Sequence, residues 1–191
     1  MNDFNTYKEG LDLDFLKDYC VGNGQLTQFE RGDYFECVGR PSSRIGYIMR
    51  GCFKFIVRNE VNGKDFITGF SFNNEFVADY PNCLIGRLSE VNIVADMPSE
   101  VYVIGGDELR RMFDQDIVKL RVGKSLSEAL FTQTYSRFLD HYRLDARGRY
   151  MKLLSRCPSV VQQLSLKDIA SFLNVTPKTI SQVRRDITFG E

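Results

Sequence analysis

The sequence predicts an α+β protein with an N-terminal β-barrel, one long helix and a C-terminal pair of short helices. Three observations support this prediction. Short apolar and β-branched runs alternate with turn signals over residues 25–104. Residues 114–142 contain no proline and one glycine, which suits a long helix. Two further helix starts with capping residues follow within residues 164–185.

The first 113 residues (1–113) are predicted to form a β-barrel domain. Five runs have the composition of strands, namely Gly46–Met49, Phe53–Val57, Phe66–Phe72, Val91–Ala95 and Val101–Ile104. Turn signals separate these runs, and Asn62 with Gly63 is a strong hairpin signal because both residues tolerate positive φ. Several short strands at this spacing favour a barrel or a sandwich.

Residues 114–142 are predicted to form one helix that pairs with a second copy of the chain. We expect Asp114 to cap this helix, which then starts at Gln115. Its apolar residues form two neighbouring stripes, Ile117, Leu120, Phe131, Phe138 and Tyr142 on one, and Val118, Val122, Leu126, Ala129 and Leu130 on the other. Such a helix, roughly 40 Å long, exceeds what one small barrel can cover, so the sequence predicts a homodimer. A core helix of a larger monomer is the alternative.

Residues 143–191 are predicted to form a DNA-binding domain around two short helices. Ser165 can cap the first helix, with Asp168 closing a capping box three residues later. Thr176 can cap the second helix. Asn174 lies at the turn between them, where a left-handed residue is needed and asparagine is tolerated. The spacing indicates a helix-turn-helix.

The second of these helices carries a polar stripe opposite its apolar residues Ile180 and Val183. The stripe residues follow at i, i+3, i+4 and i+7, and they are Lys178, Ser181, Gln182 and Arg185. Lysine suits guanine and glutamine suits adenine in the major groove, so the stripe is predicted to read bases. The other candidate DNA-binding residues, some of them for phosphates, are Lys167, Thr176, Thr179 and Arg184. An ordinary helical hairpin with a solvated polar face is the alternative.

The distribution of charge favours nucleic acid as the partner. The whole chain is balanced, with 25 basic and 25 acidic residues. Residues 141–191 carry nine Lys and Arg against four acids, a net charge of +5, and residues 1–140 carry 16 against 21, a net charge of −5. Such asymmetry indicates a C-terminal region that binds anions, double-stranded DNA first, with a solvated basic surface as the alternative.

The segment Leu164–Arg185 resembles the DNA-binding motif of the Crp/Fnr transcription regulators, the catabolite activator and its relatives. Upstream, Phe29–Asp33, Ile45–Gly51 and Asn62–Lys64 are similar in order and spacing to the strand and turn pattern of that family's cyclic-nucleotide-binding barrel. The resemblance covers nearly the whole chain. It implies a jelly-roll effector domain, a dimerisation helix and a winged-helix-type DNA reader. Only Asp186–Glu191 follow the second helix, so a short or truncated wing is expected.

The resemblance also locates a candidate effector pocket. Its residues are Phe72, Asn74, Glu75, Arg87, Ser89 and Glu90. Glu75 matches the carboxylate that holds a ribose in relatives that bind cyclic nucleotides. Asn74 replaces the glycine beside the phosphate, and Ser89 with Glu90 falls in the slot of an Arg-Ser pair. A carboxylate there would repel a phosphate, so we expect a different ligand or none. The alternative is an insertion that shifts Arg87, two residues away, to this position.

No set of residues in the chain favours an enzyme. His141 is the only histidine, and the five cysteines include no CxxC pair, so no nucleophile–base pair or metal site is recognisable. We therefore expect no catalytic residue, no metal and no other cofactor.

The expected function is a sequence-specific transcription regulator that binds an inverted-repeat operator as a homodimer. RNA polymerase is a further candidate partner. The alternatives are a true cyclic-nucleotide sensor and a barrel scaffold for a protein partner. No apolar run approaches the ~18 residues of a membrane span, and no secretory signal is visible, so a cytoplasmic protein without membrane contact is expected.

Overall fold

The computed structural model describes residues 4–189, which form two compact units. The larger unit is Lys8–Glu128, and the smaller unit joins Met1–Tyr7 to Ala129–Glu191. Among the described residues, no helix is long and apolar enough to cross a membrane. The boundary between the units falls inside the longest helix, and each unit is described separately below.

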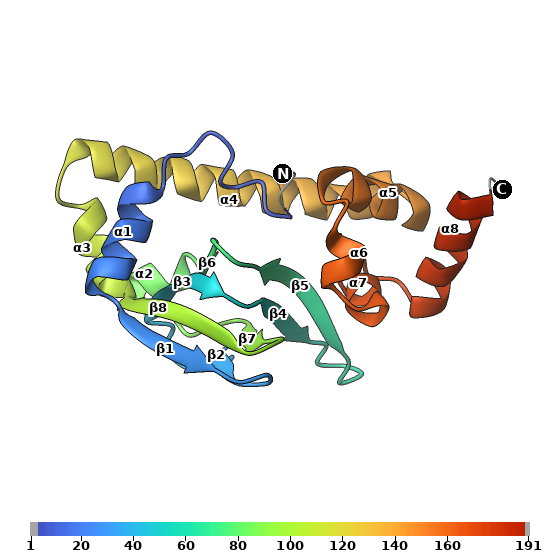
Figure 1. The fold of residues 1–191 in the computed structure, drawn as a ribbon, viewed down its shortest axis with the longest axis horizontal. Coiled ribbons are helices and arrows are strands. Elements are labelled where there is room, and N and C mark those ends of the chain that lie inside the picture. The colour runs from blue at the N-terminus through green and yellow to red at the C-terminus, as the bar shows by residue number, and fades with distance from the viewer. Residues whose placement is uncertain (1–3, 190–191) are drawn as a thin grey trace. The chain divides into compact units, whose positions relative to one another are not determined.

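Two four-stranded antiparallel sheets form the centre of the larger unit (Figure 1). One sheet has the order β1-β8-β3-β6 and the other β2-β7-β4-β5. The strands are β1 (Gln25–Phe29), β2 (Tyr34–Glu36), β3 (Arg44–Arg50), β4 (Phe53–Arg58), β5 (Asp65–Ser71), β6 (Phe76–Val77), β7 (Asn92–Ala95) and β8 (Ser99–Gly105). This arrangement confirms the predicted α+β class and jelly-roll fold, although the two sheets do not close into one barrel.

The core lies between the two sheets. Phe29 from one sheet packs against Phe35 and Phe53 from the other, with ring centroids 5.8 and 5.4 Å apart, and the Phe35 and Phe53 centroids lie 5.9 Å apart. Gly46 on β3 allows this close packing, because a Cβ atom there would overlap the side chain of Val101. The buried aromatic and branched side chains of both inner faces thus form a single apolar cluster.

The predicted hairpin at Asn62 and Gly63 is confirmed, but its turn is longer than two residues. β4 pairs with β5 up to Arg58 and Asp65, which leaves six residues in the connection. Gly63 alone has positive φ there, at 66°. The Asn59 carboxamide accepts hydrogen bonds from the backbone N–H groups of Val61 and Asn62, at 3.0 Å each. An asparagine side chain therefore organises this turn.

In the larger unit, helices cover one of the two sheets. The smaller unit consists of helices and the segment before Lys8. The larger unit contains α1 (Asp14–Asn23), α2 (Asn82–Ile85), α3 (Gly106–Phe113) and the first part of α4 (Ile117–Arg143). The smaller unit contains the rest of α4 with α5 (Ala146–Arg156), α6 (Val160–Gln163), α7 (Leu166–Phe172) and α8 (Pro177–Phe189). α1 and α3 both pack on β3 and β8.

The long helix begins later than predicted. The sequence predicts a start at Gln115 with Asp114 as cap, whereas α4 begins at Ile117. Asp116 is the capping residue, because its carboxylate accepts hydrogen bonds from the N–H groups of Val118 and Lys119 at 2.9 Å each. Asp114 instead ends α3. Two acidic residues two positions apart offered alternative caps, and the preceding helix takes the first.

Candidate nucleic-acid interface and effector pocket

α7 and α8 form the predicted helix-turn-helix, and both predicted caps are confirmed. The Ser165 hydroxyl accepts a hydrogen bond from the Asp168 N–H at 3.1 Å, and the Thr176 hydroxyl accepts one from the Thr179 N–H at 3.1 Å. The Asp168 carboxylate accepts from the Ser165 hydroxyl at 2.6 Å, not from the backbone N–H that a capping box uses. Asn174 has a φ of 52°, so the turn contains the left-handed asparagine that the sequence predicts.

Apolar side chains hold the two helices together. Ile169 and Ala170 are buried on α7, and Ile180 and Val183 are buried on α8. Ala170 is fully buried, and its small side chain allows α8 to approach closely. The inward direction of Ile180 and Val183 orients α8 so that its opposite face lies in solvent.

The polar stripe of α8 occupies this solvent face. Lys178, Gln182 and Arg185 are exposed, and Ser181 is half-buried. The Gln182 carboxamide is held on both sides, because its Nε2 donates to Asp186 Oδ1 and its Oε1 accepts from Arg185 Nη2, at 2.6 Å each. Asp186 was not among the predicted residues, although its spacing of four from Gln182 is a helical contact signal. A bidentate contact of Gln182 with adenine requires both bonds to rearrange.

The flanking candidates also lie on or near the surface. Lys167, Thr176 and Arg184 are exposed, and Thr179 is half-buried. The hydroxyls of Thr176 and Thr179 lie 2.8 Å apart in a hydrogen bond, so these two side chains serve the cap of α8.

The second helix extends beyond its predicted end. The sequence places Asp186–Glu191 after the helix, but α8 continues through Asp186 to Phe189. The last two residues of that segment lie outside the described residues. None of residues 186–189 is glycine or proline, so no residue there interrupts the helix.

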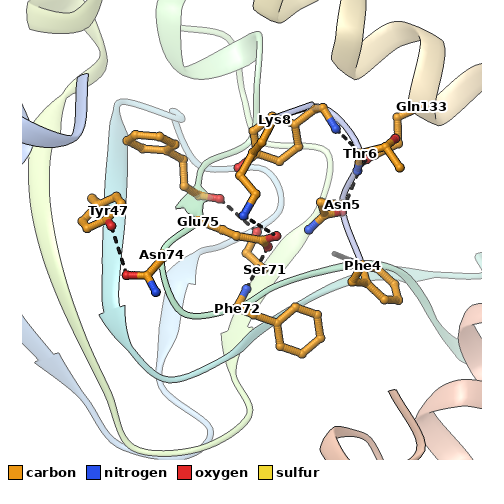
Figure 2. Close-up of polar contacts among 12 residues, drawn as sticks. Phe4, Asn5, Thr6, Lys8, Tyr47, Ser71, Phe72, Asn74, Glu75 and Gln133 are labelled. Carbon is orange, nitrogen blue, oxygen red and sulfur yellow. Dashed lines mark hydrogen bonds and ion pairs between the residues drawn. The ribbon is translucent and has the colours of Figure 1, made fainter. Parts of the chain in front are cut away.

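In the candidate effector pocket, Glu75 already has partners within the chain (Figure 2). Glu75 is 2% exposed, and its Oε1 lies 3.5 Å from Lys8 Nζ. Its Oε2 accepts a hydrogen bond from the Phe72 N–H at 3.0 Å. Asn74 has a φ of 61°, and its Oδ1 accepts from the Tyr47 hydroxyl at 3.1 Å. Asparagine therefore adopts the left-handed backbone that usually calls for glycine.

The predicted phosphate slot is organised around a carboxylate of the chain itself. Asp79 Oδ2 accepts hydrogen bonds from Ser89 Oγ at 2.9 Å, from the Glu90 N–H at 3.1 Å and from Asn82 Nδ2 at 3.1 Å. Ser89 is buried, whereas Glu90 and Arg87 are exposed. Asp79 was not among the predicted residues, because a bond across ten positions leaves no local sequence signal.

The same architecture occurs in solved structures of bacterial regulators. FixK2 from Bradyrhizobium japonicum matches with a TM-score of 0.73 at 15% identity, over 87% of this chain and 86% of that one. CLP from Xanthomonas campestris, a c-di-GMP responsive global regulator, matches with a TM-score of 0.69 at 14% identity, over 94% and 93%. A transcriptional regulator of the CRP/FNR family from Thermus thermophilus matches with a TM-score of 0.63 at 13% identity, over 87% of each chain.

This chain has the Crp/Fnr fold. No family model and no curated protein matches its sequence. At identities of 13–15%, the structural matches to the three regulators show the fold alone, and this fold confirms the predicted architecture.

On this Crp/Fnr fold, the second half of α4 exposes four aromatic side chains, here called the aromatic ladder: Phe131, Tyr135, Phe138 and Tyr142. Consecutive rings lie 5.6, 6.4 and 5.1 Å apart between centroids. Phe131 and Tyr142 are 68% and 77% exposed. A continuous exposed run of large aromatic side chains marks an interaction surface.

The second predicted stripe of α4 has a different environment. Leu126 is 4% exposed in the single chain, whereas Val118 is exposed. At Gly123, a Cβ atom would come within 3.0 Å of the Phe113 ring, so α4 closely approaches α3 here. Leu126 is therefore part of the chain's own core and does not belong to a seam with a second copy.

Proposed function

We propose that this chain is a sequence-specific transcription regulator of the Crp/Fnr type that binds an inverted-repeat operator as a homodimer. The helix-turn-helix carries this proposal, because both of its helices are capped and α8 presents the stripe from Lys178 to Arg185 to solvent. The net charge of +5 over residues 141–191 supports it, since phosphate contacts supply much of the affinity for DNA.

The aromatic ladder supports the homodimer. A second copy of α4 laid against Phe131 and Phe138 would remove these rings from water, at about 25 cal/mol for each Å² of apolar surface buried. Two copies of α8 related by a twofold axis would then enter half-sites about one helical turn apart, ~34 Å. We place the protein in the cytoplasm with its DNA, with RNA polymerase as a further candidate partner and with no catalytic activity.

A binding-site selection from a pool of random duplexes tests the proposal. We expect enrichment of an inverted repeat. Lys178→Ala and Gln182→Ala should then each cost roughly 1–3 kcal/mol on the selected site and relax discrimination at one or two base pairs per half-site. Lys124→Ala, which removes an exposed lysine on α4, is the control and should bind as the wild type does.

Two outcomes would contradict this. Equal losses on selected and random DNA for both variants would mean that another face of the protein reads the bases. A pool without any enriched sequence would favour the alternative, a scaffold that binds a protein partner.

We further propose that the effector pocket does not take cyclic AMP. Its carboxylate, Glu75, is paired with Lys8, and the Ser89 hydroxyl and Glu90 N–H donate to Asp79. The ribose of a cyclic nucleotide would have to displace Lys8 from the buried Glu75 carboxylate, and the phosphate would enter next to the Asp79 carboxylate, which repels it. Calorimetric titration with cyclic AMP should give no saturation in the low micromolar range, and saturation there would overturn this proposal.

A further inference from the structure

The first described residues of the chain are bound tightly within the smaller unit. The Gln133 side chain of α4 accepts hydrogen bonds through Oε1 from the backbone N–H groups of Thr6 at 2.6 Å and Tyr7 at 3.2 Å (Figure 2). Its Nε2 donates to Asn5 Oδ1 at 3.3 Å. Gln133 and Asn5 are both buried. One carboxamide thus satisfies two backbone donors of a segment that forms neither helix nor strand.

An aromatic side chain joins this segment to the helix-turn-helix. Phe4 is 2% exposed, and its ring centroid lies 5.1 Å from that of Phe172 on α7. The guanidinium of Arg137 lies over both rings, at 5.1 and 5.4 Å from their centroids, and that of Arg156 lies 5.3 Å from the Phe4 ring. We call residues 4–7 the brace, because they contact α4, α5 and α7.

The next residue of the chain is bound in the other unit. Lys8 belongs to the larger unit, where its ammonium group pairs with the buried Glu75 carboxylate. One residue spans at most ~3.6 Å of extended chain. A larger displacement of Lys8 must therefore be transmitted through the backbone to Tyr7 and the brace.

We infer that the N-terminal segment links the state of the Glu75 carboxylate to the order of the helix-turn-helix. While Lys8 occupies Glu75, the brace is held at both ends, by the ion pair on one side and by Gln133 and Phe172 on the other. A molecule that takes Lys8's place at Glu75 releases one end. The brace then detaches more often, and α7 loses the packing of Phe4. The physical link needs no DNA, while its use in regulation rests on the proposed function.

Amide hydrogen exchange of the full chain, measured without DNA, tests the link. Lys8→Ala removes the ion pair in the larger unit. We expect about tenfold faster exchange for the amides of Thr6, Tyr7 and α7. Lys8→Arg keeps the charge and should restore slow exchange. Lys54→Ala, the matched control, removes an equally shielded lysine that pairs with Asp96 at 2.8 Å in the same unit, and it should leave α7 unchanged.

Coupling between two sites is reciprocal, which provides a second test that does not alter the ion pair. Phe4→Ala loosens the brace directly, and it should also accelerate exchange of the Phe72 N–H that donates to Glu75. Exchange of α3 serves as the internal reference. The inference is overturned if Lys8→Ala changes only residues 46–77, if Phe4→Ala leaves the Phe72 amide unchanged, or if α3 accelerates equally in both variants. A failed operator selection would not affect any of these results.

Discussion

Gln182 is the residue whose side-chain state bears most directly on the proposed base reading. Its carboxamide lies between Arg185 and Asp186, and its hydrogen bonds to both side chains fix its orientation. Asp186 also places a carboxylate beside a surface that must approach phosphates. Under the proposed function, α8 holds its central polar side chain with bonds that compete with DNA, which would lower the affinity and reject weak sites.

Replacing Asp186 tests this competition. Asp186→Asn removes the charge, and we expect it to tighten binding to the selected operator by about 1 kcal/mol, because one repulsion and one charge-assisted hydrogen bond are lost. Fluorescence anisotropy at fixed salt measures the change. Glu128→Gln, which neutralises an exposed carboxylate on α4, is the control. Tightening of the same size in both variants would assign the effect to net charge alone.

The cysteines differ sharply in their chemistry. Burial raises the pKa of the Cys20 and Cys83 thiols to about 12 from the usual 9, so both remain protonated thiols at neutral pH. Cys37 is the one cysteine of the five that is not buried. We expect a thiol reagent at pH 8 to label Cys37 in the native protein while Cys20 and Cys83 react only after unfolding.

The same shift gives a sign for the pH dependence of stability. A thiol whose pKa is raised by folding contributes stability that is fully present at pH values below its pKa in the unfolded chain. This contribution is lost as the pH rises through its pKa in the folded chain. The free energy of unfolding should therefore fall between about pH 9 and 12. Denaturation at several pH values, with Cys83→Ala as comparison, measures this fall.

At the scale of elements, α4 combines two kinds of apolar contact. Leu126 packs within its own chain, whereas the aromatic ladder is exposed. We expect Leu126→Ala to lower the free energy of unfolding by about 2–5 kcal/mol, as for other buried leucines. Phe138→Asp should leave the fold intact and give monomers, because it places a charge in the proposed seam. Analytical ultracentrifugation with thermal melts separates the two effects, and a wild-type monomer at micromolar concentration would rule out the seam.

Elements set by neighbours in sequence could be predicted, and elements set by distant partners could not. The caps of α7 and α8 are bonds across three residues, so Ser165 and Thr176 identified both helix starts. The five predicted runs correspond to β3, β4, β5, β7 and β8. β1, β2 and β6 were not predicted, because β2 and β6 have only three and two residues and β1 is mostly exposed. The start of α4 was wrong by two residues, since Asp114 and Asp116 are equivalent as sequence signals.

The candidate pocket shows the same limit. Phe72, Asn74 and Glu75 were predicted and lie together in one turn. The partners of the pocket residues were missed. Lys8 pairs with Glu75 from far away in the sequence, and Asp79 accepts a hydrogen bond from Ser89 across ten residues. No periodicity or spacing records such pairings, which arise only when the sheets assemble.

At the scale of the whole molecule, the concentration of positive charge in residues 141–191 predicts that the affinity for DNA depends strongly on salt. Arg184 is exposed beside the stripe of α8. Arg184→Ala should weaken binding to all sequences alike and flatten the slope of log affinity against log salt by about one unit per half-site. Titrations at several salt concentrations on selected and random duplexes measure the slope. A loss of affinity confined to the selected duplex would mean that Arg184 contacts a base and not a phosphate.

The seat of the brace also orders events during synthesis. Phe4 is made long before Arg137, Arg156 and Phe172, whose side chains pack against its ring. The two sheets, contained in Lys8–Glu128, have all of their strands before any of these three residues is made. The growing chain therefore carries an unburied Phe4 ring until Phe172 has been made, and the unit that contains the helix-turn-helix cannot pack around Phe4 earlier.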